Sequence, residues 1–249
     1  MSGHNKWSKI KRKKGVADAK RGKEFTRVIK EITVAVKEGG SSDPEMNPRL
    51  RLAIANAKGI NMPKENTERA IKKAEESGGA GYEELTYEAY APGGIAVFVE
   101  VATDNTNRTV SNLRSLFSKS GGSLATSGSV AFLFERKGVF EFLLGNYSED
   151  ELMLDLIDAG AEDVEVDEDY VTLTCAFEDF GNVQDKLEKM NIEVKKAGVE
   201  YIPKTTTALE LNEAKKVLRL IEKLEDDDDV QSVYHNLELS DELIAELEQ

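Results

Sequence analysis

The chain contains very little cysteine and histidine, and this scarcity excludes several classes of protein. Its 249 residues include one Cys, Cys175, and two His, His4 and His235. A single Cys cannot form a disulfide framework or a multi-cysteine metal site. Two His residues far apart in the sequence leave little for a zinc site or for His-based catalysis. Cys175 and His235 each lie within a predicted strand, so we expect both to be structural residues.

Long apolar runs are also missing. The longest runs, such as residues 130–134, have the length of a strand, whereas a helix that spans a membrane needs about 20 apolar residues. The N-terminus carries charge but lacks the apolar core segment of a signal peptide. Its basic, acid-poor composition is shared with mitochondrial transit peptides, but a reducing cytosol fits the whole chain better. We therefore expect a cytoplasmic protein without a membrane partner.

No group of residues typical of an active site or a cofactor site is evident. The glycine pairs at 39–40, 78–79 and 121–122 lack the spacing of phosphate-binding or dinucleotide-binding loops. The acidic run Asp226–Asp229 lacks the alternating ligands, the Gly and the closing Glu of a calcium loop, and it predicts a solvated turn. We expect a protein that is not an enzyme and has no cofactor, metal or small-molecule substrate. The alternative is an enzyme with its site around Arg108 and neighbouring carboxylates.

Charge is abundant and unevenly distributed. The net charge is −14, yet residues 1–75 carry 19 Lys/Arg against 9 Asp/Glu, and residues 76–249 carry 14 against 38. Such polarity is typical of an anion-binding arm on an acidic body. Residues 1–22 hold eight Lys/Arg and a single acid, Asp18. They have too little apolar surface to offset the entropy of ordering, so we expect a flexible basic arm over 1–22.

The basic arm predicts binding to a polyanion, with a steep dependence on salt because each neutralised phosphate releases counterions. Trp7 is the only tryptophan, and its ring could stack on an unpaired base or pack on the helical part of the protein itself. A solubilising tail or a site for acidic proteins is the alternative to nucleic acid. The predicted nucleic-acid-binding residues are Lys6, Trp7, Lys9, Lys11, Arg12, Lys13, Lys14, Lys20, Arg21, Lys23 and Arg27.

A second candidate patch follows a predicted strand and begins a predicted helix. It includes Asn105, Asn107 and Arg108 within the polar run 103–109. One interpretation is ordinary capping of the helix by Asn105 or Thr106. The other is a hydrogen-bonding platform in which Arg108 is the charged member. The spacing of these residues fits both interpretations.

Hydrophobic spacing predicts a small helical domain over residues 23–79. Apolar side chains from Phe25 to Val36 recur at intervals of three and four, as on one face of a helix. Gly39-Gly40 ends this helix. Two Asx-Pro pairs, Asp43-Pro44 and Asn47-Pro48, have the pattern of a cap followed by Pro at the first helical position. A further helix follows Pro63.

From residue 80 onward the apolar period changes to that of strands, which predicts an α+β fold with three domains. Strands at 87–91, 95–101 and 130–134 and a helix near 106–119 are expected first. Residues 137–203 follow the order βαββαβ of a ferredoxin-like domain. A helix at 212–225, a strand at 230–239 and a short helix at 241–248 complete the chain. We expect 80–136 and 204–249 to form one discontinuous α/β domain, into which 137–203 is inserted.

Several ordered motifs resemble the YebC family over essentially the whole chain. They are Gly3-His4-Asn5-Lys6-Trp7, Asp18-Ala19-Lys20-Arg21-Gly22-Lys23, Asn47-Pro48-Arg49-Leu50-Arg51, Asn61-Met62-Pro63-Lys64-Glu65-Asn66, Glu68-Arg69-Ala70-Ile71-Lys72-Lys73, Pro92-Gly93-Gly94, Thr103-Asp104-Asn105, Asn107-Arg108-Thr109 and Gly128-Ser129-Val130. The resemblance implies a helical N-terminal domain followed by two α/β domains. The family is described as probable transcriptional regulators that bind DNA in the cytoplasm. Mitochondrial relatives act as translational activators, and bacterial relatives have been linked to the ribosome.

Charge and resemblance together predict a non-enzymatic, nucleic-acid-binding regulator of gene expression, with DNA as the expected target. Phosphate contacts from the arm would position the protein without reading sequence. The alternative is a ribosome-associated translation factor that binds ribosomal or transfer RNA, because RNA can be recognised by shape and unpaired bases without a groove-reading helix. The acidic body would repel phosphate and is a candidate surface for the ribosome or other proteins.

Overall fold

The computed structural model describes residues 18–76 and 81–247 of the chain. These residues pack as two units. The first comprises 18–30, 81–135 and 201–247, and the second comprises 31–76 and 136–200. Within the described ranges no helix combines the length and the apolar character needed to cross a bilayer.

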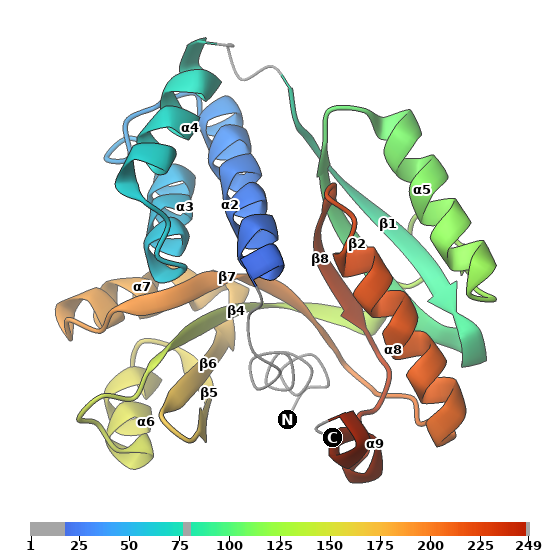
Figure 1. The fold of residues 1–249 in the computed structure, drawn as a ribbon. Helices are drawn as coiled ribbons and strands as arrows, with labels where there is room; N and C mark the ends of the chain where they lie inside the picture. Colours follow the sequence, from blue (N-terminus) through green and yellow to red (C-terminus); the bar gives the residue numbers. More distant parts are fainter. Residues whose placement is uncertain (1–17, 77–80, 248–249) are drawn as a thin grey trace. The chain divides into compact units, whose positions relative to one another are not determined.

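The first unit contains a four-stranded sheet in the order β3-β1-β2-β8. Figure 1 labels β1, β2 and β8 of this sheet. The strands are β1 (Glu83–Ala91), β2 (Ile95–Thr103), β3 (Ser123–Leu124) and β8 (Val230–His235). Pro92–Gly94 connects β1 to β2, and Gly93 and Gly94 both have positive φ, which favours glycine in a tight turn. β8 pairs antiparallel with β2. The C-terminal part of the chain therefore completes the sheet that β1 and β2 begin.

Alternating side chains of β2 serve two different cores in the first unit. Ile95, Val97 and Val99 are buried on one face, against α5 (Thr106–Lys119) and α8 (Leu211–Glu225). Ala96 and Phe98 are buried on the other face, among Val130, Phe134, Tyr201 and Tyr234. This alternation follows from the period of two along a strand. The short helix α9 (Asp241–Leu247) also contributes Leu243 to the first core.

The second unit contains a sheet in the order β5-β6-β4-β7. Its elements are β4 (Phe134–Leu143), α6 (Glu149–Ile157), β5 (Ala161–Asp167), β6 (Tyr170–Ala176), α7 (Phe180–Lys189) and β7 (Val194–Pro203). Side chains of α6 and α7, such as Leu152 and Leu187, are buried against Phe140, Phe142 and Leu173 of the sheet. This chain order with this strand order is the ferredoxin-like arrangement.

The same unit includes α3 (Pro48–Gly59), α4 (Lys64–Glu76) and the later part of α2 (Asp18–Gly39). Asn47 fixes the connection between α2 and α3. Its Oδ1 accepts a hydrogen bond from the backbone N–H of Leu50, and its Nδ2 donates to the carbonyls of Ala35 and Ser41. Asn47 followed by Pro48 is therefore a helix N-cap with Pro at the first helical position, as predicted.

The predicted α+β fold class is confirmed by these elements, and the predicted helix at 106–119 matches α5. The predicted domain limits of 23–79, 80–136 with 204–249, and 137–203 stay a prediction. Two expectations near the N-terminus were wrong. α2 begins at Asp18, so residues 18–22 are helical and do not belong to a flexible arm. Asp43-Pro44 begins only a turn, and the next helix starts at Pro48.

Two predicted strands also differ from the structure. Residues 130–134 are not a strand, because Ala131–Leu133 form a 3₁₀ turn before β4 begins at Phe134. Val130 and Phe134 are buried in the same cluster, whereas Phe132, which would share their face in a regular strand, is 64% exposed. The predicted strand 230–239 ends at His235, where the N–H of Asn236 donates to Ala96 and the chain leaves the ladder.

Candidate nucleic-acid interface

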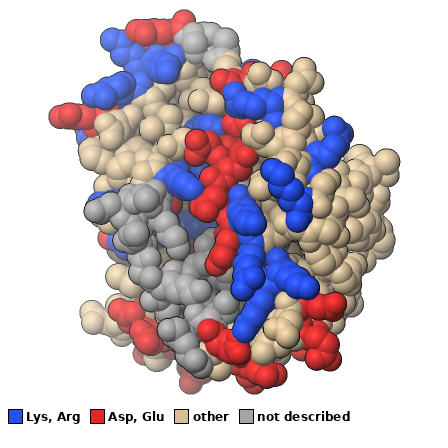
Figure 2. All heavy atoms as spheres, turned by 45° about the vertical axis from the view of Figure 1, so that its right-hand side comes forward, with Lys and Arg blue, Asp and Glu red and all other residues tan. Residues whose placement is uncertain are grey.

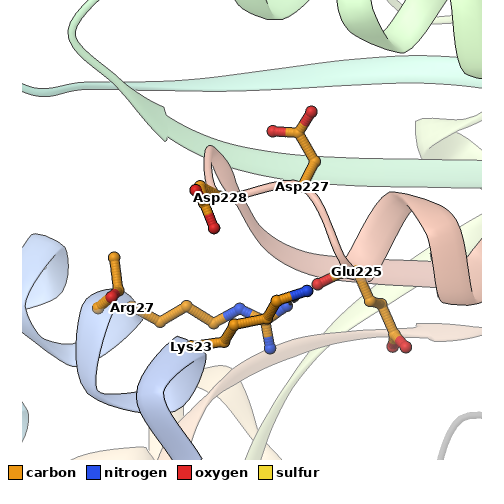
Figure 3. A pocket seen from close by; sticks show the side chains of 6 residues that line it. Lys23, Arg27, Glu225, Asp227 and Asp228 are labelled. Carbon is orange, nitrogen blue, oxygen red and sulfur yellow. Dashed lines mark hydrogen bonds between the residues drawn. The ribbon is translucent and has the colours of Figure 1, made fainter. Parts of the chain in front are cut away.

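Three cationic side chains lie on one face of α2, at the spacing i, i+4 and i+7. Lys23, Arg27 and Lys30 all extend toward the end of α8 and the acidic turn that leads into β8. Figure 3 shows Lys23 and Arg27 reaching from α2 toward Glu225 and the aspartates that follow it. Lys23 and Arg27 line a shallow hollow in the first unit together with Glu225, Asp227 and Asp228.

Lys23 and Arg27 bind mainly backbone carbonyls at the C-terminal end of α8 and at the start of β8. Lys23 Nζ donates to Oδ1 of Asp226 at 2.7 Å and to its carbonyl at 3.1 Å. Arg27 Nε donates to the carbonyl of Val230 at 3.2 Å, and Nη2 donates to that of Glu225. The last carbonyls of a helix have no partner within it and carry partial negative charge. These two cations therefore stabilise the end of α8 and hold α2 against it.

Lys30 is buried, with a side chain that is only 5% exposed. Its ammonium group donates to the carbonyls of Ala102 (2.8 Å) and Asp228 (2.7 Å) and to Oδ1 of Asp229 (3.0 Å). An ammonium group has three protons to donate, and each has an acceptor here. A buried charge is tolerated when it is paired and fully hydrogen-bonded in this way.

Asp229 is the shared acceptor of a buried polar cluster. Besides Lys30, its carboxylate accepts hydrogen bonds from the guanidinium of Arg108 (2.8 Å to Nη2) and from Oγ1 of Thr109 (2.8 Å). Burial alone would raise the pKa of Asp229. The hydrogen bonds from Arg108, Lys30 and Thr109 outweigh that effect and lower the pKa to about 2. Asp229 is therefore ionised at neutral pH.

The structure places the second predicted patch at the start of α5. Asn105 caps the helix, because its Oδ1 accepts the N–H of Arg108 at 3.0 Å. Arg108 also pairs with Asp104 at 2.8 Å. Asn107 is exposed in the first turn. The capping interpretation is thus confirmed, and the Arg108 side chain is held by two carboxylates.

The prediction of a solvated turn at 226–229 was wrong for Asp229, which is 4% exposed. Sequence reasoning also missed Lys30. Lys30 lies in α2 between Val28 and Ile32, both of which are buried. A charge at a core-facing helical position is the signal that could have indicated a buried ion pair.

Most of the predicted arm lies outside the described residues. This holds for Lys6, Trp7, Lys9, Lys11, Arg12, Lys13 and Lys14, and the side chain of Lys20 is also not described. Arg21 is exposed, with its guanidinium 5.8 Å from the centroid of the Phe25 ring. Figure 2 shows Lys and Arg side chains lying beside Asp and Glu side chains on the face it draws.

Cys175 and His235 are both buried, with 0% exposure. Burial, together with the neighbouring carboxylates of Asp179 and Glu162, raises the pKa of the Cys175 thiol to about 11. A thiol of this kind is protonated at neutral pH and is a poor nucleophile. Among residues 18–76 and 81–247, no group of three or more His, Cys, Asp or Glu side chains is arranged to hold a metal ion.

Comparison with known proteins gives a consistent result along the chain. Residues 5–77 match the N-terminal domain of the TACO1/YebC protein, and residues 82–237 match the second and third domain of TACO1/YebC. A probable transcriptional regulatory protein from Geotalea uraniireducens is 54% identical over 243 residues, covering 97% of this chain and 98% of that protein. One from Treponema denticola is 50% identical over 240 residues, covering 96% and 97%.

A solved structure agrees with the sequence matches. The crystal structure of a conserved hypothetical protein from Aquifex aeolicus is 46% identical, with a TM-score of 0.82, and the match covers 90% of this chain and 93% of that one. Identity at this level over nearly the full length of several relatives establishes common descent and a common fold. The chain therefore belongs to the TACO1/YebC family.

Proposed function

We propose that the protein is a non-enzymatic regulator of gene expression in the cytoplasm that binds nucleic acid, DNA in the first instance, through its basic N-terminal arm. The observation that carries the proposal is the charge polarity of the chain, with eight Lys/Arg and one acid in residues 1–22. A cluster of this density is the electrostatic footprint of a phosphate-binding segment. Relatives about 50% identical are named probable transcriptional regulatory proteins, which agrees with a regulatory role.

The cations of the arm and of α2 would then have different roles. Lys23, Arg27 and Lys30 already bind carbonyls and carboxylates of the first unit. We therefore assign these three to holding α2 against α8. The phosphate contacts fall to the residues that precede them, from Lys6 to Arg21. Asn105, Asn107 and Arg108 form at most a secondary contact, because Arg108 is engaged by Asp104 and Asp229.

Ribosomal or transfer RNA is the second candidate target, and one feature of α4 favours it. α3 and α4 are joined by a short turn, as in a helix-turn-helix, so α4 would be the helix to enter a DNA groove. α4 carries four Lys/Arg and four Asp/Glu. Two of its cations are paired along the helix, Lys64 with Glu68 and Lys72 with Glu76. A helix with no net positive charge is poorly suited to a groove lined by phosphates, whereas a basic arm suffices for structured RNA.

The arm is tested by changing Lys11, Arg12, Lys13 and Lys14 to Ala in the full chain. Binding of labelled duplex DNA, single-stranded RNA and transfer RNA is measured by fluorescence anisotropy over a range of salt concentrations. Each phosphate contact contributes about 0.9 to the slope of log K against log salt on duplex DNA. Loss of four contacts should therefore flatten that slope by about 3 to 4 and weaken binding to every polyanion.

The matched control removes four exposed cations that lie outside the arm and outside α4: Lys119, Lys189, Lys216 and Lys223 to Ala. It changes the net charge equally and should leave the slope unchanged. Equal effects from both variants would show that only overall charge matters and would refute the assignment to the arm. The target is then identified by ultraviolet crosslinking in the native cell lysate and sequencing of the recovered DNA and RNA. Discrete DNA sites support a transcriptional role, and ribosomal or transfer RNA supports a role in translation.

A further inference from the structure

One end of the sheet in the first unit is almost free of charge. Segments 89–99, 120–134 and 201–209 together contain a single Lys, Lys204, and no Arg, Asp or Glu, in a chain that is 32% charged. Residues 95–99, Val130 and Phe134 are buried, so their lack of charge follows from the core. The exposed residues of the three segments are also uncharged, apart from Lys204. Depletion of charge is typical of the centre of an interface.

The three segments are joined by backbone hydrogen bonds. Residues 89–90 of β1 pair with Leu124 and Ser123 of β3. The N–H of Lys204 donates to the carbonyl of Leu133 at 2.9 Å. These segments themselves therefore present no carboxylate to an approaching polyanion, and they present one ammonium group, that of Lys204.

Phe132 projects from this surface, with 64% of its area exposed. It lies in the 3₁₀ turn Ala131–Leu133, and the turn is fixed from below by Glu88 of β1. The Glu88 carboxylate accepts hydrogen bonds from the backbone N–H groups of Gly128 (2.6 Å), Val130 (2.5 Å) and Ala131 (2.9 Å). Burial would raise the pKa of Glu88, but these amides outweigh it and lower the pKa. An exposed aromatic ring on so firmly held a turn is preorganised for contact.

Polar groups suited to a nucleotide surround the turn. Lys204 Nζ donates to the carbonyl of Phe132 at 3.0 Å and is exposed. Tyr90, which is 37% exposed, donates to the carbonyl of Ser129 at 3.1 Å. Thr126 and Ser129 supply hydroxyl groups 3.0 Å apart. The other exposed Phe, Phe177, differs because the guanidinium of Arg136 lies 4.1 Å from its ring centroid.

We propose that this surface is a second nucleic-acid contact, at which an unpaired nucleobase stacks on Phe132 while Lys204 binds the adjacent phosphate. The inference rests on the proposed function, because it takes the ligand to be a nucleic acid. It adds a site for single-stranded or looped segments, since only an unpaired base can offer its face to an aromatic ring. Stacking tolerates any base, so the contact selects unpaired structure and not sequence.

The test uses the full chain and a labelled oligoadenylate of about 12 nucleotides, a length within the range of single-strand sites. Phe132→Ala should weaken binding by about 5- to 150-fold, the range measured for loss of one stacked base. The slope of log K against log salt should not change. Phe132→Trp should retain or improve the affinity, and an abasic backbone of the same length should not distinguish Phe132→Ala from the parent protein.

Lys204→Ala should reduce the salt slope by about 0.7, the value for one contact on a single strand. Phe177→Ala is the matched control and should bind as the parent does. Equal affinity of Phe132→Ala and the parent for oligoadenylate would overturn the proposal and would leave Phe132 as a surface for a protein partner. Failure of the proposed role of the arm would be seen separately. In that case the protein with Lys11–Lys14 changed to Ala would keep the salt slope of the parent, while Phe132→Ala would still lose affinity.

Discussion

Replacing Asp229 by Asn should destabilise the first unit strongly, although the two side chains have nearly the same shape. Asp229 is 4% exposed and accepts hydrogen bonds from Lys30, Arg108 and Thr109. The Asn amide offers one acceptor oxygen, and its nitrogen would face donors. The buried Lys30 ammonium group would then have no carboxylate to balance its charge. Breaking a buried ion pair from one side costs about 3–5 kcal/mol.

That cost is large compared with the total stability of a domain, about 5–15 kcal/mol. For a chain of this size each kcal/mol corresponds to about 2–4 °C in Tm, so we expect Tm to fall by at least several degrees. The measurement is urea and thermal unfolding followed by circular dichroism. Asp226→Asn is the matched control, because Asp226 pairs with Lys23 at an exposed position (69% and 37%), where such pairs contribute about 0–1 kcal/mol.

The pH dependence gives an independent check of the same interaction. The pKa of Asp229 is about 2 in the folded protein, below the ordinary value of about 4 for Asp. The ionised form is therefore favoured by folding, and its contribution is fully present above pH 4 and is lost as the pH falls toward 2. The shift corresponds to about 2 kcal/mol. Asp229→Asn should lose this part of the acid dependence. If Asp229→Asn and Asp226→Asn unfolded at the same urea concentration and with the same pH profile, the cluster would not have the role we assign to it.

Two further predictions concern other buried groups. Glu88→Gln should lower the free energy of unfolding by about 1–3 kcal/mol, because the amide nitrogen would face backbone N–H donors. The parent protein should also lose stability toward acid because folding lowers the pKa of Glu88, and this loss should be smaller in the variant. Urea unfolding at pH 7 and at pH 4 measures both effects. Cys175, whose buried thiol has a pKa of about 11, should react with a thiol reagent at pH 8 only after addition of denaturant, and rapid labelling of the folded protein would contradict its burial.

The sequence predicted the elements whose signals are local. The apolar spacing of α5, the capping residue Asn47 before α3 and the order βαββαβ all depend on neighbours within a few residues. The two-residue strand β3 is too short to show a period of two, and its existence depends on pairing with residues 89–90 of β1. Such a strand cannot be read from its own residues.

The candidate site was less predictable, because its central residue is defined by distant partners. Asp229 lies in a run of four aspartates, which favours a solvated turn. It is buried because Lys30 and Arg108, 199 and 121 positions earlier, bind its carboxylate. Glu88 is a similar case: a charged residue in a strand is expected to face solvent, and its burial depends on backbone N–H groups about 40 positions later. Nothing near either residue in the sequence encodes these contacts.

The contacts of α2 also change how the charge of the chain is interpreted. From the sequence alone, Lys23 and Arg27 were predicted to bind nucleic acid together with the cations of the arm. In the structure Lys23, Arg27 and Lys30 neutralise the end of α8 and the acidic turn after it, which leaves the eight cations of residues 1–22 for a nucleic acid. Eight contacts on duplex DNA limit the contribution of the arm to the salt slope to about −7. A steeper slope would require either release of Lys23 and Arg27 from α8 or a contribution from Lys204. The two can be separated, because release would loosen the attachment of α2 to α8, whereas Lys204→Ala would remove the Lys204 contact and leave the contacts of α2 in place.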